Sequence, residues 1–336
     1  MIEVLSSGTL STVQDLGRLS HLRFGVGTSG AMDRLALQAG NLMLGNVATA
    51  AGIEVPVLPF QVRFLQDVDF AVTGADAAAN LDGLAIAPWW TRRARAGQVL
   101  TLGGVGPGFR SGARSYLLIA GGVDVPVVLG SRSTQLRGQF GGHHGRALLK
   151  GDVLPGQPAL ALQGGPHAGF GIMPADLALP QSEFFAAPSH NAVTAMRVVP
   201  AAEYDNFDAA SLQNFWGTDW KISPQSDRYG YRLTGVALAL RETMETRSHG
   251  IVPGVIQVPH SGQPIIQMRD AQPSGGYPKI GTVIEADLWR LGQARAGSLI
   301  RFVPSTYEEA VAALEPIEAY LAKVRYLSAL YQQLHD

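Results

Sequence analysis

The fold of this protein is decided by residues 248–289, which read SHGIVPGVIQVPHSGQPIIQMRDAQPSGGYPKIGTVIEADLW. Residues 255–258 and 264–268 have the alternation and the apolar composition that are typical of strands. Residues 260–263, HSGQ, join them and contain a glycine, as the turn of a hairpin often does. The stretch therefore predicts an antiparallel β-hairpin.

A group of polar residues follows the second strand of this hairpin. Arg269 and Asp270 come directly after it, and residues 274–278, SGGYP, follow. Two adjacent glycines allow positive φ angles and leave no Cβ to hinder an approaching ligand. Binding groups concentrate on loops that a rigid strand scaffold holds in place. We therefore treat this loop as a candidate binding site, and the alternative is a glycine-rich strand crossing in a β-barrel.

The composition of the chain excludes several classes of protein. Its 336 residues suggest about two domains, and a net charge of −1 argues against binding of nucleic acid. The absence of cysteine excludes disulfides, thiolate metal sites and a thiol nucleophile. The N-terminal residues MIEVLSSG do not have the pattern of a signal peptide, and no apolar run is long enough to span a bilayer. We expect a cytoplasmic protein that binds neither nucleic acid nor a membrane.

Short strands separated by glycine-rich turns dominate residues 53–162, which predicts a sandwich or a barrel rather than a parallel α/β sheet. Helices are predicted at residues 31–44, capped by Ser29 or Asp33, and at residues 201–215. Apolar residues at a spacing of about 3.5 predict a third helix over residues 307–334, which Pro316 should kink or divide. We expect this helix to pack on the second of two barrels.

The division into domains follows from a loss of periodicity. Residues 164–191 have no regular pattern and are rich in proline, which marks a boundary. We expect an N-terminal β-rich domain over residues 1–180, a C-terminal domain over residues 190–303, and a helical extension over residues 304–336. The predicted fold class is mainly β with peripheral helices.

A second group of candidate binding residues lies near the N-terminus. Residues 11–33 are rich in Gly, Ser and Thr and carry Asp15, Arg18, Ser29 and Asp33. Residues 25–30, GVGTSG, match a GxGxxG template, but no buried strand precedes them, so we expect no dinucleotide fold. An anion held at the N-terminus of the following helix is an alternative.

Two further features carry less information. His143 and His144 lack the spacing of a zinc motif, so we expect no metal in this chain. Asp227 with Arg228 or Arg232 is compatible either with a structural ion pair or with an anion site.

Motifs spread over residues 1–303 occur in an order and at spacings that are typical of one family. They are residues 11–18 (STVQDLGR), 29–33 (SGAMD), 41–46, Glu54, 130–134 (GSRST), 226–233, 253–259 and 270–278. On these motifs the chain resembles the allophanate hydrolase subunit 2 family, whose members include the C subunit of prokaryotic 5-oxoprolinases, also called KipA-like proteins. It departs from the family pattern at Gly40, His249 and Pro273-Ser274.

The resemblance implies a fold, a function and partners. The family is similar to one half of the carboxyltransferase part of urea carboxylase, which implies two cyclophilin-like β-barrel domains. Together with a KipI-like B subunit and an A subunit, such a C subunit hydrolyses 5-oxo-L-proline to L-glutamate, driven by ATP. One alternative is the carboxyltransferase subunit of a biotin-dependent carboxylase of urea-like amides, and another is a regulatory partner of a KipI-like protein. No lysine follows a methionine as in a biotin attachment site, so biotin would be carried by a partner chain.

The implied chemistry needs donors on an amide oxygen, an acceptor for its N–H group and a guanidinium for developing charge. For catalysis we single out Asp270, Arg228 and Tyr277. For binding of a small amide substrate we single out Arg18, Asp15, Ser29, Asp33, Gln257, Ser274, Gly275 and Gly276. ATP would be used through the complex.

Overall fold

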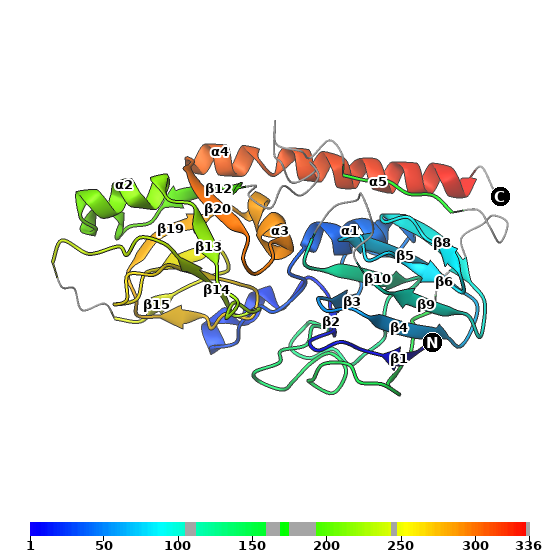
Figure 1. The fold of residues 1–336 in the computed structure, drawn as a ribbon. Helices are drawn as coiled ribbons and strands as arrows, with labels where there is room; N and C mark the ends of the chain where they lie inside the picture. Colours follow the sequence, from blue (N-terminus) through cyan, green and yellow to red (C-terminus); the bar gives the residue numbers. More distant parts are fainter. Residues whose placement is uncertain (105–111, 159–168, 175–192, 243–246, 334–336) are drawn as a thin grey trace. The chain divides into compact units, whose positions relative to one another are not determined.

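The chain is mainly β with a few helices, as the sequence predicts (Figure 1). This computed structural model describes residues 1–104, 112–158, 169–174, 193–242 and 247–333. The helices are η1 (Leu19–Phe24), α1 (Arg34–Met43), η3 (Tyr204–Asn206), α2 (Ala209–Gly217), α3 (Glu285–Gln293), α4 (Tyr307–Ala312) and α5 (Glu315–Gln333). The strands before residue 175 are β1 (Ile2–Ser6), β2 (Thr12–Gln14), β3 (Gly52–Val55), β4 (Phe60–Phe64), β5 (Val68–Gly74), β6 (Asn80–Leu81), β7 (Leu84–Ala85), β8 (Trp90–Ala94), β9 (Val99–Leu102), β10 (Ser115–Ile119) and β11 (Val153–Leu154). The strands after it are β12 (Val193–Pro200), β13 (Trp220–Ile222), β14 (Gly230–Thr234), β15 (His249–Gly250), β16 (Val255–Gln257), β17 (Ile265–Gln267), β18 (Ser274–Gly275), β19 (Lys279–Val283) and β20 (Leu299–Pro304).

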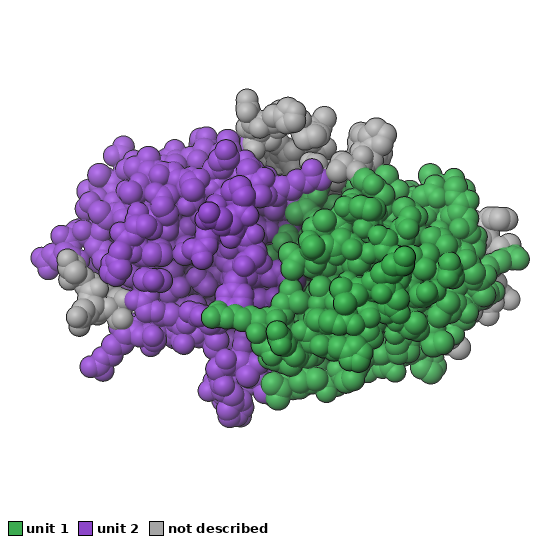
Figure 2. All heavy atoms as spheres, turned by 60° about the horizontal axis from the view of Figure 1, so that its bottom comes forward, with its two compact units in different colours: residues 1–18, 29–177, 316–336 green, residues 19–28, 178–315 purple. Residues whose placement is uncertain are grey.

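The chain divides into two compact units (Figure 2). Unit 1 comprises residues 1–18, 29–177 and 316–336, and unit 2 comprises residues 19–28 and 178–315. A short N-terminal segment therefore belongs to unit 2, and the end of the chain belongs to unit 1. The domain boundary expected between residues 180 and 190 lies outside the described residues, and the three domains stay a prediction.

Unit 1 is built from two antiparallel sheets that share one apolar core. One sheet has the strand order β11-β1-β4-β9-β6-β7 and the other β2-β3-β10-β5-β8. Alternation decides which side chains enter the core, because successive residues of a strand point to opposite faces. In β4, Phe60, Val62 and Phe64 are buried, whereas Arg63 between them is exposed. Apolar side chains from both sheets form a single cluster, so unit 1 is a sandwich.

Helix α1 packs against strands β5 and β10 of unit 1. Asp33 caps its N-terminus, because Asp33 Oδ1 accepts a hydrogen bond from the Ala36 backbone N–H at 2.9 Å. The Thr73 hydroxyl of β5 donates to the Ala36 carbonyl at 2.7 Å and fastens the helix to the sheet. Of the two caps that the sequence suggests, the structure therefore selects Asp33.

Unit 2 contains a closed barrel of seven strands in the order β12-β19-β16-β17-β14-β13-β20. The predicted hairpin is confirmed, because β16 pairs antiparallel with β17 and Ile256 lies opposite Ile266. Inside unit 2, Phe215 of α2 stacks on Phe302 of β20, with ring centres 4.7 Å apart. The large aromatic surfaces that these residues bury attach α2 to the barrel.

The structure changes one predicted helix, over residues 201–215, and confirms the division of another, over residues 307–334. The helix expected over residues 201–215 is a 3-10 turn, η3, followed by α2, since Asp208 caps α2 by accepting from the Ser211 N–H at 2.6 Å. The C-terminal helix is divided as expected at Pro316, into α4 and α5. Among the residues that the structure describes, none of the helices is both long and apolar enough to cross a membrane.

Helix α5 packs on unit 1, whereas α4 contacts β12 of the barrel, so the prediction of one helix packed on the second barrel holds only for its first part. The Tyr320 hydroxyl donates to the Ile172 carbonyl at 2.8 Å, and the Ser328 hydroxyl donates to the Met43 carbonyl at 3.1 Å. The buried positions of α5 are Tyr320, Val324 and Ser328, which form one narrow stripe four residues apart. Because two of these three side chains carry hydroxyls, the spacing of the apolar residues does not reveal this face.

Candidate functional site

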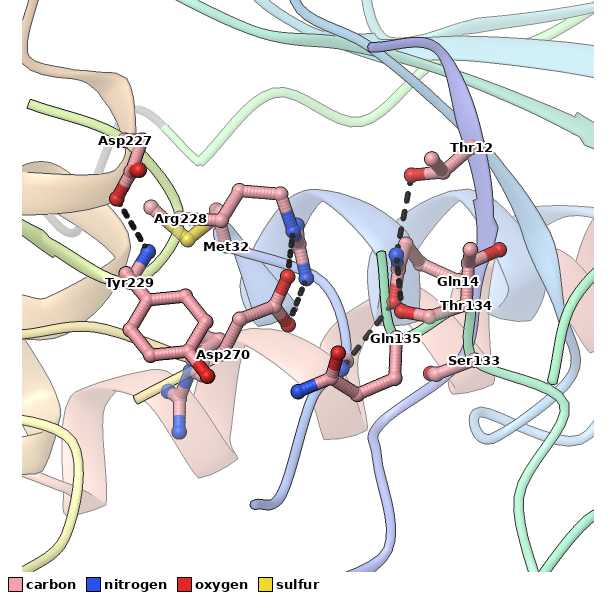
Figure 3. Close-up of polar contacts among 12 residues, drawn as sticks. Thr12, Gln14, Met32, Ser133, Thr134, Gln135, Asp227, Arg228, Tyr229 and Asp270 are labelled. Atoms are coloured by element: carbon pink, nitrogen blue, oxygen red, sulfur yellow. Dashed lines mark hydrogen bonds and ion pairs between the residues drawn. The ribbon is translucent and has the colours of Figure 1, made fainter. Parts of the chain in front are cut away.

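Asp270 and Arg228 form a buried ion pair in unit 2 (Figure 3). Arg228 Nε donates to Asp270 Oδ2 at 2.9 Å, and Arg228 Nη2 donates to Oδ1 at 3.0 Å. Asp270 is 2% exposed and Arg228 is 6% exposed. The Asp270 N–H also donates to the Arg228 carbonyl at 2.8 Å, which fastens the two stretches side by side. A guanidinium held in one orientation in this way can stabilise negative charge that develops on an oxygen.

Asp227 has a different role from its neighbour Arg228. Its Oδ1 accepts from the backbone N–H groups of Tyr229 at 2.7 Å and Gly230 at 3.2 Å. Such bonds from an aspartate to the residues that follow it are those of a turn. Arg228 pairs with Asp270 and not with Asp227, whose side chain accepts the hydrogen bonds of the turn.

The segment of unit 2 that comes from the N-terminus packs beside the candidate catalytic carboxylate. The Thr28 hydroxyl donates to the Arg269 carbonyl at 3.1 Å. A Cβ at Gly27 would lie 2.6 Å from the Ala271 carbonyl oxygen, so only glycine allows this approach. The Arg269 side chain pairs with Glu285 at 2.9 Å. Residues 27–28 and 269–271, which are remote along the chain, therefore lie in contact.

Gln257 lies on barrel strand β16 with its side chain buried. Its Nε2 donates to the Tyr277 carbonyl at 3.2 Å, and its Oε1 accepts from Gln267 Nε2 at 3.1 Å. A Cβ at Gly275 would lie 2.6 Å from Gln257 Nε2. A larger residue at position 275 would therefore require the Gln257 amide to shift, and the φ angle of Gly275 is not positive. The structure therefore brings together Gln257 and Gly275, which are two of the predicted substrate-binding residues.

The remaining residues of the glycine loop lie nearer to the surface of unit 2. Ser274 is exposed, Gly276 is half-buried and Tyr277 is 44% exposed. The Tyr277 ring lies edge-on to His260, with ring centres 6.2 Å apart. The catalytic role of Tyr277 and the binding roles of Ser274 and Gly276 stay predictions.

A cluster of charged residues beside this loop is missing from the sequence-based site. Lys279 Nζ lies 2.7 Å from Glu203 Oε1 and 3.2 Å from His249 Nδ1. His249 also lies opposite Gly275 in the pairing of β15 with β18. In the sequence, His249 stands out only as a departure from the family pattern. The cluster has no local motif, because its members come from three separate parts of the chain.

Asp15 organises a serine-containing loop of unit 1. Its Oδ1 accepts from the hydroxyls of Ser131 and Ser133 and from the Gly17 N–H at 2.8 Å. Its Oδ2 accepts from the Arg132 N–H at 2.6 Å. These contacts are internal to unit 1 and stabilise the loop. Its predicted role in substrate binding stays a prediction.

Arg18 is attached to the same loop as Asp15. It is 2% exposed, and its guanidinium donates to the carbonyls of Ser133 and Val128. The guanidinium carbon lies 4.8 Å from the centre of the Phe140 ring. Stacking and hydrogen bonding together hold a planar guanidinium in one orientation. The structure therefore brings Asp15 and Arg18 to one loop of unit 1.

Ser29 and Asp33 lie just before α1, in a segment fastened by a buried pair that the sequence-based site omits. Glu54 Oε2 accepts from the Tyr116 hydroxyl at 2.7 Å and from the Met32 N–H at 2.8 Å. Burial, reinforced by the charge of Glu54, raises the pKa of Tyr116 well above its usual range. The phenol therefore keeps its proton and can donate to Glu54. A glutamate within the wholly buried strand β3 is the signal that could have revealed this pair.

His143 lies near a carboxylate but not in a metal-binding group. Its Nε2 is 3.5 Å from Asp152 Oδ1, and its ring centre is 4.3 Å from that of His144. Burial lowers the pKa of His143. Within the described ranges, no three His, Cys, Asp or Glu residues are grouped so that they could hold a metal ion.

We expect the ion pair of Asp152 with Arg146 to stabilise unit 1 at neutral pH. This stabilisation should be lost in acid. Hydrogen bonds from Arg146, 2.7 Å and 2.8 Å long, lower the pKa of Asp152 to about 2. A carboxylate with a lowered pKa stabilises the fold above its unfolded pKa of about 4, and the stabilisation is lost as pH falls from about 4 to 2. The shift corresponds to about 2 kcal/mol, and the 38% exposure of Arg146 lowers this to about 1 kcal/mol.

Chemical denaturation of wild type and Asp152→Asn between pH 7 and pH 2 measures this contribution. The difference in free energy of unfolding should be about 1 kcal/mol at pH 7 and should disappear near pH 2. Arg146→Met serves as the reciprocal variant and should give a similar difference. A difference that stays constant over the whole range would show that the pair does not contribute in this way.

Comparisons with known proteins place these features in a family. The family model described as carboxyltransferase domain, subdomain A and B, matches residues 24–304. The chain is 40% identical to the 5-oxoprolinase C subunit of Haemophilus influenzae, over 97% of this chain and 98% of that protein. It is 39% identical to the 5-oxoprolinase C subunit of Escherichia coli, over 100% of this chain and 99% of that protein. The crystal structure of the K. lactis urea amidolyase is similar with a TM-score of 0.83 and 29% identity, over 96% of this chain and 20% of that chain. The chain therefore belongs to the carboxyltransferase domain family, subdomains A and B.

Proposed function

We propose that this chain is the C subunit of an ATP-dependent 5-oxoprolinase. In this role it hydrolyses 5-oxo-L-proline to L-glutamate together with the A and B subunits. The observation that carries the proposal is the match with the H. influenzae C subunit, which extends over 97% of this chain and 98% of that protein. By contrast, this chain corresponds to only 20% of the urea amidolyase chain.

The Arg228–Asp270 pair supplies the chemistry that opening of a lactam needs. The reaction breaks the amide bond of a five-membered ring, and negative charge develops on the lactam oxygen. Asp270 orients the Arg228 guanidinium in a buried environment, where its positive charge interacts strongly with such an oxygen. We assign Tyr277 as a further hydrogen-bond donor, and Gln257 and Gly275 as groups that shape the binding surface.

The proposal requires partners and ATP. The enzyme is completed by the A and B subunits, of which the B subunit is KipI-like, and this chain alone is expected to be inactive. ATP is used through the complex, which we place in the cytoplasm. Biotin enters only under the alternative function, in which a partner chain carries it and the substrate is urea or a urea-like amide. The similarity to urea amidolyase supports that alternative.

Reconstitution tests the proposal. We expect purified chain, mixed with the purified A and B subunits, to form L-glutamate from 5-oxo-L-proline with matching release of inorganic phosphate from ATP. Omitting any one chain should abolish both products, and replacing 5-oxo-L-proline with urea should give neither. Carboxylation of urea by the chain with a biotin-carrying partner would favour the alternative. Full activity without this chain would instead favour a purely regulatory role.

A further inference from the structure

The cluster of Lys279, Glu203 and His249 in unit 2 has a shielded part and an open part. Lys279 and Glu203 form an ion pair, 2.7 Å long, whose side chains are 15% and 13% exposed. The His249 side chain is 49% exposed, and its Nδ1 lies 3.2 Å from Lys279 Nζ. The ion pair is therefore largely removed from solvent, and the imidazole is the part of the cluster that a ligand can reach.

The cluster decides which nitrogen of His249 carries the proton. An ammonium group can only donate, so His249 Nδ1 accepts the hydrogen bond from Lys279. Glu203 Oε1 lies 3.8 Å from Nδ1, which is too far for a hydrogen bond. In the neutral imidazole the proton is therefore on Nε2. The bond from Lys279 orients the ring, and the Nε2–H group is left as a donor.

His249 lies on a face of unit 2 that carries two of the predicted substrate-binding residues. It lies opposite Gly275 in the antiparallel pair of β15 and β18, and opposite residues have their side chains on the same face. A Cβ at Gly275 would lie 2.6 Å from Gln257 Nε2, so this face is turned towards the Gln257 amide. Lys279 in turn lies opposite Gln257 in the pairing of β16 with β19. The imidazole therefore borders the candidate site within unit 2.

We infer that His249 is a specificity-determining residue, which donates a hydrogen bond from Nε2 to the carboxylate of 5-oxo-L-proline. The inference rests on the proposed function, since this substrate carries a carboxylate on its lactam ring and urea carries none. A hydrogen bond to an ionised acceptor is about twice as strong as one between neutral groups. Lys279 and Glu203 are positioning residues, because they act through the imidazole. His249 thus distinguishes a lactam acid from neutral amides.

The test measures kcat and KM of the reconstituted complex with His249→Asn and His249→Gln. The asparagine amide ends near the position of Nδ1, so it can still accept from Lys279 but has no donor at the position of Nε2. His249→Asn should raise KM for 5-oxo-L-proline about tenfold, the lower end of the effect of one hydrogen bond to a charged group. It should leave kcat unchanged, because the carboxylate takes no part in the reaction and is bound equally in the ground state and the transition state.

Two controls accompany this variant. The longer glutamine amide places a donor near the position of Nε2, so His249→Gln should keep KM within about threefold of wild type. His144→Asn replaces an exposed histidine of unit 1 and should change neither constant. Thermal melting of both His249 variants should match wild type, because the side chain is half-exposed.

A wild-type KM in His249→Asn would overturn the inference, and so would a loss confined to kcat. 2-Pyrrolidinone, which has the same lactam ring without the carboxylate, should inhibit wild type and His249→Asn equally. Weaker inhibition of the variant would also overturn the inference, because His249 would then act on the ring. These outcomes leave the proposed function intact, since the wild-type complex still forms L-glutamate. Failure of the wild-type complex to act on 5-oxo-L-proline would contradict the proposed function and this inference with it.

Discussion

Replacing Asp270 with asparagine is expected to destabilise unit 2 by about 3 kcal/mol, the cost of removing one partner from a buried ion pair. The substitution keeps the shape of the side chain but leaves the Arg228 guanidinium, which is 6% exposed, without its carboxylate. Turnover by the reconstituted complex should fall by about two orders of magnitude, since the guanidinium is then no longer held for charge stabilisation. Thermal melting and turnover, measured on the same preparation, check both expectations.

The ion pair of the neighbouring residue, Arg269, with Glu285 provides a matched control. Glu285→Gln removes the partner of Arg269, but Glu285 is 45% exposed, so this variant should lose less than about 1 kcal/mol and keep its turnover. The double variant Arg228→Met with Asp270→Leu should regain stability relative to Asp270→Asn, because no uncompensated buried charge remains, yet it should stay inactive. Normal turnover in Asp270→Asn, together with a lowered melting temperature, would show that the pair has a structural role and no catalytic one.

Replacing Gly141 with alanine is expected to destabilise unit 1 by about 3 kcal/mol or more. A Cβ at this position would lie 2.2 Å from the Ser133 carbonyl oxygen and 2.8 Å from Arg18 Nη2. The first of these atoms belongs to the backbone, so the clash cannot be relieved by turning a side chain. Alanine would also have to adopt a φ angle of +69°. Because Ser133 accepts from Arg18, the variant should displace the guanidinium as well.

Gly130→Ala is the control for the backbone conformation alone. Gly130 has a φ angle of +76°, but a Cβ there would meet nothing within 4 Å. Gly130→Ala should therefore lower the free energy of unfolding only by the strain of the left-handed conformation, about 1 kcal/mol. Chemical denaturation of both variants separates the two contributions. Equal losses would show that the close approach of the Ser133 carbonyl is relieved at little cost.

Several features of this protein follow from its sequence, because they depend on residues a few positions apart. The hairpin of β16 and β17 is visible in the alternation of its strands and in the glycine of its turn. The capping of α1 by Asp33 and the division of the C-terminal helix at Pro316 are local in the same sense. The sequence also singles out Asp270 and Arg228 as residues suited to catalysis.

Only the tertiary structure decided which polar groups meet. Arg228 and Asp270 are 42 residues apart along the chain, and Asp15 and Ser133 are 118 residues apart. Many carboxylates in the sequence could neutralise one arginine. The partner is chosen by which strands the closed barrel brings within hydrogen-bond distance, and the cost of burying an unpaired charge then makes the pairing obligatory. The unit on which α5 packs was decided in the same way, because its buried stripe includes hydroxyls whose acceptors lie on remote parts of the chain.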